Sequence, residues 1–249
     1  MKDLSNITAV ILAGGLGTRL RSVVSDRPKV LAEVHGRPFL TYLLDQLASL
    51  KVKEAVLCTG YLADQVRKTL GEAYGPLKLV YSPEPSPLGT GGALRLALPF
   101  FHSDPVLVMN GDSFLETDLS LFWNWYCARD ADAALLLFHM DQTGRYGRVS
   151  IDFEGRVLSF SEKDAQGSPG WINGGIYLVR RHLIKAIPEG RPVSMEKEIF
   201  PSLIGQKIYG YSSQGRFIDI GIPETYAAKE AFFDGETQDD KKPVCRAGS

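Results

Sequence analysis

The sequence predicts an α/β protein built on a mixed, mostly parallel sheet that is flanked by helices. Three observations support this fold class. Apolar runs of strand length alternate with stretches of helical spacing through residues 1–130. The first run, residues 7–13, has the apolar character of a parallel strand buried on both faces. Residues 131–233 contain shorter runs joined by tight turns, which indicates a small α+β extension of the same sheet.

The elements of the first half follow from its periodicity. Five leucines recur at helical spacing over residues 37–50, and Pro38 stands where a first helical turn accepts proline. Ligands of such sheets bind beyond the carboxyl ends of the strands, so functional residues should follow the strands directly. The other elements expected here are strands at 55–58, 77–81 and 105–109 and helices at 63–70, 91–98 and 119–129.

The second half shows no linker rich in Pro, Gly or Ser at its start, so residues 1–233 are predicted to form one domain. Residues 234–249 are polar and lack periodicity, which predicts a disordered tail. The elements expected in this half are strands at 133–140, 148–151, 157–160, 172–180 and 217–220 and helices at 194–203 and 223–233.

The composition argues against several classes of protein. The 249 residues include 28 Lys and Arg and 29 Asp and Glu, so the net charge of −1 leaves no large basic surface for nucleic acid. No apolar run reaches the roughly 18 residues that span a bilayer, and the N-terminus does not resemble a signal peptide. The three cysteines, at positions 58, 127 and 245, lack disulfide or zinc-site spacing. We therefore expect a cytoplasmic protein that binds neither nucleic acid nor membranes.

A glycine-rich loop follows the first predicted strand. Three glycines in four positions leave backbone N–H groups free to form an anion-binding nest. Arg19 and Lys29 add two cations near the same rim. The spacing fits neither a GxGxxG fingerprint nor a Walker A loop, and a tight turn with two solvated cations is the alternative interpretation. The candidate binding residues of the loop are Leu12, Ala13, Gly14, Gly15, Gly17 and Thr18.

The segment LAGGLGTRL followed by PK resembles the signature of the sugar-1-phosphate nucleotidylyltransferases. The resemblance covers residues 7–232 and includes, in order, PLGTGGA, NGD, YGRV, EK, NGG and DIG. The stretch GTRLRSVVSDRPK…GRPFL is most similar to the guanylyltransferases that act on D-glycero-D-manno-heptose 1-phosphate. Members of the family join a nucleoside triphosphate to a sugar 1-phosphate and release pyrophosphate.

The resemblance implies a Rossmann-like fold of the nucleotide-diphospho-sugar transferase type, with a nucleotide half at about residues 1–130 and a sugar-phosphate half at about 131–233. The glycine loop would bind the nucleotide, while Lys29 would contact its α-phosphate and Arg19 the leaving pyrophosphate. The attacking phosphate oxygen is already ionised, so catalysis needs positioning and charge neutralisation and no side-chain nucleophile. A homodimer is suggested by analogy. The short stretch after DIG leads us to expect no C-terminal β-helix or acyltransferase domain.

Two aspartates that follow predicted strands are candidates for binding Mg²⁺. Asp112 stands in the NGD motif, and Asp219 stands in the DIG motif. Mg²⁺ uses few protein oxygens and keeps coordination sites for phosphate. The resemblance assigns the metal to both positions, and a turn or cap carboxylate is the alternative for each.

The segment after the third predicted strand is expected to bind the base. Pro87 and Gly89 belong to a glycine-containing turn that permits close approach of a flat base and its ribose. The carboxylate of Glu84 could accept hydrogen bonds from guanine N1–H and N2–H₂ together, whereas uracil offers a single N–H donor. This favours GTP, with an exposed loop glutamate as the alternative. The Thr90 hydroxyl would either cap the following helix or contact the ligand.

The resemblance places the sugar phosphate against the second half of the chain. Glu162 would accept hydrogen bonds from sugar hydroxyls, and Lys163 would bind the sugar phosphate. A solvated acid–base pair at the start of a loop is the alternative. Asn110, Gly147 and Asn173 complete the predicted sugar-phosphate set.

Other functions stay open at this point. Mannose or glucose 1-phosphate with GTP, UTP or CTP fits the same motifs. A non-catalytic regulatory protein that binds a sugar nucleotide would share the fold, although the presence of every candidate catalytic and metal residue favours an enzyme. The glycine spacing argues against a dinucleotide-dependent oxidoreductase.

Overall fold

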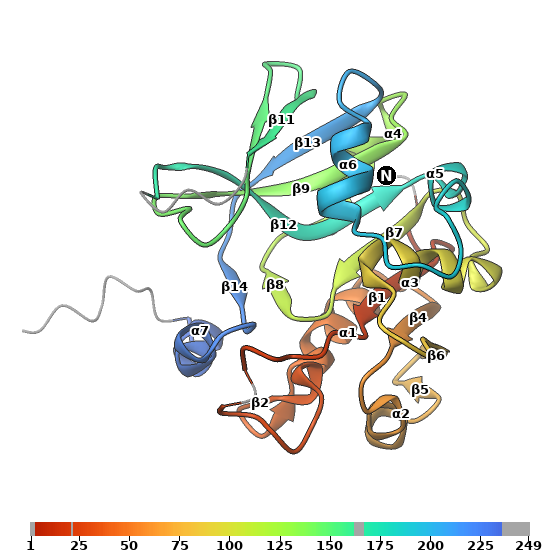
Figure 1. Ribbon diagram of the computed structural model, residues 1–249, viewed down its shortest axis with the longest axis vertical. Helices are drawn as coiled ribbons and strands as arrows, with labels where there is room; N and C mark the ends of the chain where they lie inside the picture. The colour runs from red at the N-terminus through yellow and green to blue at the C-terminus, as the bar shows by residue number, and fades with distance from the viewer. Residues whose placement is uncertain (1–2, 21, 162–166, 236–249) are drawn as a thin grey trace, which may run out of the picture.

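Within the part of the chain that the computed structural model describes, residues 3–20, 22–161 and 167–235, ten strands form one sheet (Figure 1). The order across the sheet is β11 (Val157–Ser161), β10 (Arg148–Ile151), β12 (Gly170–Val179), β7 (Val106–Asn110), β1 (Ala9–Ala13), β4 (Glu54–Thr59), β6 (Leu77–Pro83) and β5 (Ala73–Tyr74), with β9 (Ala133–Met140) paired to β12 and β13 (Ile208–Ser213) paired to β9.

The centre of this sheet is parallel, since β7, β1, β4 and β6 run in one direction. β12 pairs antiparallel with β7 and with β9, and it links the strands of the second half to those of the first. The predicted mixed, mostly parallel sheet with an α+β extension is therefore confirmed.

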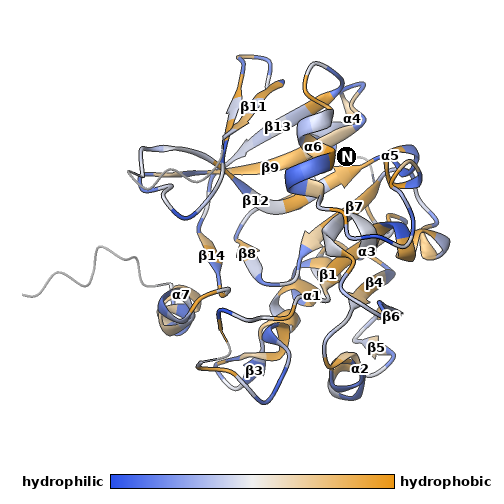
Figure 2. Cartoon of the chain, in the orientation of Figure 1, coloured by the Kyte–Doolittle hydropathy of each residue, from blue (hydrophilic) through white to orange (hydrophobic). Residues whose placement is uncertain are grey.

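Helices cover both faces, because alternate residues of the central strands point to opposite sides. In β1, Ile11 packs into the core on one face and Val10 into the core on the other. Figure 2 shows β1, β9 and β12 mainly in hydrophobic colours. One face is covered by α1 (Leu40–Ser49), α2 (Ala63–Leu70) and α4 (Leu119–Cys127), and the other by α3 (Gly89–Ala97), α5 (Arg181–Lys185), the π-helix η3 (Met195–Ile199) and α6 (Phe200–Ser202).

Three predicted helices differ in the structure. The helix expected over 223–233 is divided at Ala228 into α7 (Pro223–Ala227) and α8 (Lys229–Phe233). The helix expected over 37–50 begins at Leu40, because β3 (Arg37–Pro38) pairs with β2 (Glu33–Val34) just before it. The helix expected over 194–203 is a π-helix followed by the short α6. In this segment the Ile199 N–H donates to Ser194 O five residues earlier, and Pro201 has no N–H to continue an α-helical ladder.

β12 bends at its glycines, where the pairing with β9 shifts register. Gly175 has φ of +76°, a conformation that side chains disfavour. A Cβ at Gly175 would lie 2.5 Å from the Ser113 hydroxyl oxygen. The bend therefore lets β12 pass close to the segment that follows β7.

A two-stranded sheet connects the two halves near that bend. β14 (Phe217–Asp219) pairs antiparallel with β8 (Ser113–Leu115), which places Asp219 opposite Ser113. In Figure 1, β14 descends from the upper strands toward α7 (Pro223–Ala227). Its register brings together two segments that are far apart in the sequence.

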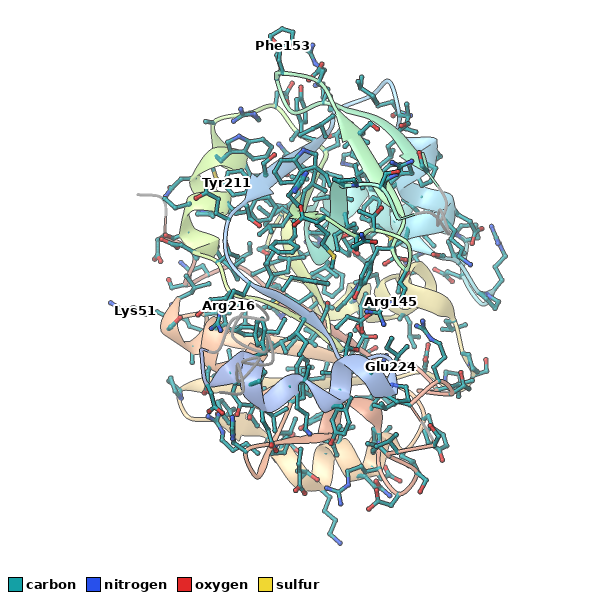
Figure 3. All side chains as sticks on the ribbon, turned by 90° about the vertical axis from the view of Figure 1, so that its left-hand side faces the viewer. Lys51, Arg145, Phe153, Tyr211, Arg216 and Glu224 are labelled. Carbon is teal, nitrogen blue, oxygen red and sulfur yellow. The ribbon has the colours of Figure 1, made fainter. Side chains whose placement is uncertain are left out.

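The C-terminal helices hold this connection in place. Phe233 of α8 (Lys229–Phe233) packs on Tyr42 of α1 with ring centroids 4.0 Å apart. Arg216, which lies above the last helices in Figure 3, pairs with Glu116 and donates to the backbone oxygen of Phe232. The segment that leads into β14 is thus held by Glu116, which follows β8, and by α8, which packs on α1 of the nucleotide half.

Two short 3₁₀ helices, η1 (Lys29–Leu31) and η2 (Leu98–Phe100), occur among the residues described. Among the described helices, none combines the length and the apolar character that a bilayer crossing requires.

Candidate active site

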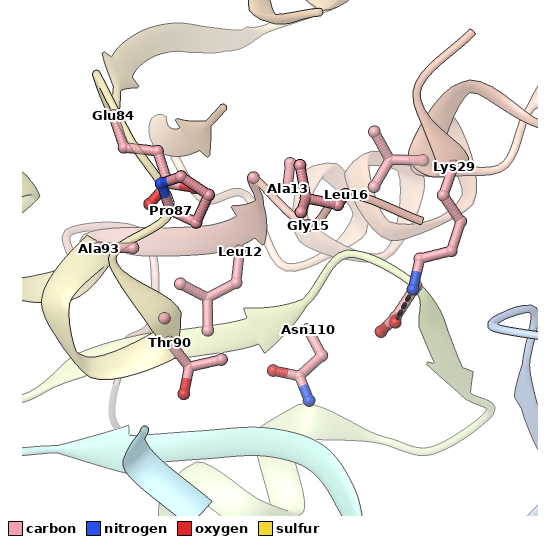
Figure 4. A pocket seen from close by; sticks show the side chains of 14 residues that line it. Leu12, Ala13, Gly15, Leu16, Lys29, Glu84, Pro87, Thr90, Ala93 and Asn110 are labelled. Atoms are coloured by element: carbon pink, nitrogen blue, oxygen red, sulfur yellow. Dashed lines mark hydrogen bonds and ion pairs between the residues drawn. The ribbon is translucent and has the colours of Figure 1, made fainter. Parts of the chain in front are cut away.

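A pocket of about 250 Å³ opens beyond the carboxyl ends of β1, β6 and β7 (Figure 4). This is the position where open α/β sheets bind ligands. The predicted residues that line it are Leu12, Ala13, Gly14, Gly15, Lys29, Glu84, Pro87, Gly89, Thr90, Asn110 and Asp112.

Three further lining residues were not predicted: Leu16, Val30 and Ala93. Leu16 lies inside the glycine loop and Val30 follows Lys29, so both could have been found as neighbours of predicted residues. Ala93 lies three residues after Thr90 and shares its face of α3.

Glu84 is held against backbone on one side of the pocket. A Cβ at Gly14 would lie 2.4 Å from its Oε1 atom, and a Cβ at Gly60 would lie 2.6 Å from the same atom. The Leu88 N–H donates to Oε2 at 3.0 Å. Burial raises the pKa of the Glu84 carboxyl, and the hydrogen bond from Leu88 opposes part of that rise. The role of Gly60 was not predicted, because it becomes visible only once β4 and β6 lie side by side.

Lys29 and Asp112 form an ion pair on the opposite side of the pocket (Figure 4). Lys29 begins η1 directly after Pro28, and Asp112 follows β7. Their side chains are 13% and 31% exposed, so the pair is shielded from solvent and still reachable from the pocket.

Asp219 lies beside this pair without lining the pocket itself. The Ile220 N–H donates to the backbone oxygen of Asp112 at 2.9 Å, and the Gly221 N–H donates to Asp219 Oδ1 at 2.6 Å. Burial and then the negative charge of Asp112 raise the pKa of Asp219, whereas the Gly221 N–H and the positive charges of Lys29 and Arg19 lower it. The two aspartates predicted for Mg²⁺ are therefore neighbours.

The donor set at these aspartates suits Mg²⁺. Two carboxylates that repel each other are the kind of group that a divalent cation stabilises. No cluster of three or more His, Cys, Asp or Glu side chains able to hold a metal occurs among the described residues. A site with only two carboxylates would leave the other coordination positions to phosphate oxygens and water, which is the pattern Mg²⁺ favours.

Thr90 does not cap α3, the helix expected to follow it, contrary to the first of the two roles considered for it. α3 begins at Gly89, one residue earlier, and no side chain caps its N-terminus. The Thr90 hydroxyl instead donates to Glu196 Oε2 at 2.7 Å and accepts from the Met195 N–H at 2.8 Å. Neither partner could be predicted, because both are more than 100 residues away in the sequence.

The remaining predicted residues lie around the pocket or outside the described chain. Gly17, Thr18 and Arg19 follow the lining part of the glycine loop, and Arg19 is exposed. Gly147 is exposed just before β10. Asn173 is part of β12, where its Oδ1 accepts from the Gly175 N–H at 2.9 Å. Glu162, Lys163 and most of the predicted tail, residues 236–249, lie outside the residues that the structure describes.

The fold and the pocket are those of a nucleotide-binding transferase, and the chain belongs to the nucleotidyl transferase family, whose sequence pattern residues 8–234 match. It is 37% identical over 219 residues to D-glycero-alpha-D-manno-heptose 1-phosphate guanylyltransferase of Aneurinibacillus thermoaerophilus, covering 88% of this chain and 94% of that protein.

It is also 36% identical over 230 residues to mannose-1-phosphate guanylyltransferase of Mycobacterium tuberculosis, covering 90% of this chain and 64% of that protein. Among solved structures, HddC from Yersinia pseudotuberculosis complexed with GMP-PN superposes with a TM-score of 0.80 at 34% identity. The match covers 91% of this chain and 99% of that one.

Proposed function

We propose that this protein is a guanylyltransferase that joins GTP to D-glycero-D-manno-heptose 1-phosphate, forming the GDP-sugar and pyrophosphate with Mg²⁺ as cofactor. The observation that carries the proposal is the Glu84 carboxylate, which lines the pocket with Oε1 facing two glycine backbones. The guanylyltransferase names of relatives that match most of the chain support it.

The reaction at this site is an in-line displacement. An oxygen of the sugar phosphate attacks the α-phosphorus of GTP, the bond from that phosphorus to the bridging oxygen breaks, and pyrophosphate leaves with the electron pair. Lys29 would donate to the α-phosphate oxygens as their charge grows. Arg19, at the exposed end of the glycine loop, would bind the departing pyrophosphate. Mg²⁺ bound by Asp112 and Asp219 would neutralise phosphate charge.

The nucleotide would lie along the glycine loop with its base near α3. The N–H groups of the loop around Gly14 and Gly15 offer donors to the phosphates. The half-buried carboxylate of Glu84 matches the two adjacent donors of guanine. Burial deprives this carboxylate of solvation and raises its pKa, and the guanine donors would partly replace the lost solvation.

The sugar phosphate would lie between Asn110 and the strands of the second half. As the resemblance implies, we assign Glu162 to the sugar hydroxyls and Lys163 to the phosphate. Asn173 would be a second hydroxyl contact and Gly147 a backbone contact, and Asn110 belongs to the same sugar-phosphate site. We also propose a cytoplasmic homodimer whose GDP-sugar product serves surface polysaccharide biosynthesis.

Mannose 1-phosphate is the second candidate substrate, favoured by the similarity to the mycobacterial mannose-1-phosphate guanylyltransferase. Pyrophosphate release should be measured for GTP, ATP, UTP and CTP against heptose, mannose and glucose 1-phosphates. We expect the highest kcat/KM for GTP with the heptose. A higher kcat/KM with mannose 1-phosphate would select the second candidate, and a preference for another nucleotide would refute the role of Glu84.

A further inference from the structure

The Glu196 carboxylate of η3 accepts hydrogen bonds from three hydroxyl groups, one of which belongs to the pocket-lining Thr90. Its Oε2 accepts from Thr90 Oγ1 at 2.7 Å and from Ser194 Oγ at 3.0 Å, and its Oε1 accepts from the Tyr177 hydroxyl at 3.2 Å. Thr90 lines the nucleotide side of the pocket, while Tyr177 lies on β12 of the second half. One carboxylate therefore joins the two halves of the site.

Tyr177 extends this network toward the sugar side. It is fully buried, and its oxygen accepts from Asn173 Nδ2 at 2.7 Å and from Asn110 Nδ2 at 3.4 Å. A carboxylate can only accept hydrogen bonds, so the protons of Thr90 and Tyr177 both point toward Glu196. The Tyr177 oxygen consequently presents only lone pairs to the two asparagines, and their amide nitrogens turn toward it.

This proton arrangement determines what the site offers to its substrates. The Thr90 oxygen keeps one lone pair beyond its bond with the Met195 N–H. Asn110 lines the pocket, and its amide oxygen is buried with no partner among the described residues. An unpaired buried acceptor is unfavourable. A substrate hydroxyl that reaches Asn110 would donate a hydrogen bond to its amide oxygen.

We propose that Glu196 is a positioning residue that sets the hydroxyl of Thr90 for the nucleotide and the amides of Asn110 and Asn173 for the sugar phosphate. The inference rests on the proposed function, because it assigns these groups to the two substrates of that reaction. Glu196 does not line the pocket and acts through its partners.

The Glu196→Gln variant tests the arrangement with little change in volume. A carboxamide donates at one end, so it can no longer accept from both Thr90 and Tyr177. If the amide nitrogen faces Tyr177, the phenolic proton turns toward the asparagines, whose N–H groups then face another donor. If it faces Thr90, the threonine hydroxyl loses its acceptor instead. We expect the KM of the substrate on the side that loses its acceptor to rise by about tenfold, the scale of one lost hydrogen bond to a charged group, with kcat changed less than about threefold.

Two further variants separate the branches of the network. Tyr177→Phe removes only the branch to the asparagines, so the KM for the sugar phosphate should rise while the KM for GTP stays unchanged. In the double variant the effects on the sugar-phosphate KM should not add, because both changes break one network. Glu198→Gln is the matched control on the same π-helix. Glu198 accepts from the Ser194 N–H and pairs with Arg191 without contacting Thr90 or Tyr177, so both KM values should stay at the wild-type level.

Steady-state kinetics with each substrate varied in turn should be combined with calorimetric binding of GTP and of the sugar phosphate and with thermal melting. Wild-type KM and Kd values in Glu196→Gln, even with a lower Tm, would overturn the inference and leave a purely structural role. Additive effects in the double variant would also overturn it. A wild-type protein that releases no pyrophosphate from any substrate pair would contradict the proposed function, and the binding data would still test Glu196.

Discussion

Replacing Glu84 by Gln should weaken the preference for GTP without disturbing the pocket. The side chains have nearly equal volume, and an amide oxygen can still accept from the Leu88 N–H that now donates to Oε2. The other oxygen, which lies against Gly14 and Gly60, would become an N–H₂ group facing the donors of guanine. The variant therefore removes at least one charge-assisted hydrogen bond.

The magnitude follows from that one bond. A hydrogen bond to a charged group contributes about 1.5–3 kcal/mol, which corresponds to a fall of roughly 10- to 150-fold in kcat/KM for GTP. The GTP-over-UTP ratio should fall with it. Inosine triphosphate lacks the guanine 2-amino group, so its kcat/KM should fall less than that of GTP. Glu72→Gln is a suitable control, because Glu72 is exposed and pairs with Arg67 on the surface.

The pH dependence gives an independent signature. Burial raises the pKa of Glu84, so kcat/KM for GTP should decline on the acid side at a higher pH than an ordinary glutamate would cause, and Glu84→Gln should lack that decline. For stability, a carboxyl whose folded-state pKa is raised contributes stability below its unfolded pKa and loses it as pH rises through the folded pKa. Glu84→Gln should therefore raise Tm near pH 7, and the difference should shrink in acid.

An unchanged GTP-over-UTP ratio in Glu84→Gln, or an equal loss for GTP and inosine triphosphate, would refute this role. Initial rates of pyrophosphate release should be measured from about pH 4 to about pH 9, because ordinary glutamates titrate at about pH 4.

Three further predictions concern the glycine loop, the metal and the lysines. Gly14→Ala should reduce the GTP-over-UTP ratio because its methyl group would displace the Glu84 carboxylate, whereas Gly15→Ala, whose Cβ meets no atom within 4 Å, should leave the ratio unchanged; equal effects of the two would contradict the packing argument. Asp112→Asn should lower Mg²⁺-dependent turnover by about 100-fold or more, and wild-type rates at saturating Mg²⁺ would exclude Asp112 as a metal ligand. Lys29→Ala should cut kcat by roughly 10²–10³ with little change in either KM, because its partner charge grows only in the transition state. Lys163→Ala should instead raise KM for the sugar phosphate, and a rise for GTP alone would refute the division into two pockets.

The sequence was sufficient for the fold class and for most of the pocket lining. Short apolar runs and helical spacing are local patterns, so they located the parallel strands, and the loop after β1 and the aspartate after β7 then followed from where such sheets bind ligands. Glu84 was found in the same way, since it stands directly after β6. Each of these residues follows a strand that a short apolar run in the sequence is enough to predict.

The parts that could not be derived from local pattern depend on contacts between distant segments. The strand at 217–220 was predicted, but Asp219 lies beside Asp112 because β14 pairs with β8, a three-residue strand that was not predicted. The bond from Thr90 to Glu196 spans 106 residues, and it exists because a π-helix from the second half packs on α3. Gly60 is needed only because Glu84 packs against it across two strands. Each of these contacts forms because the packed sheet and helices bring residues that are distant in the sequence close together. A short stretch of sequence contains no information about such contacts.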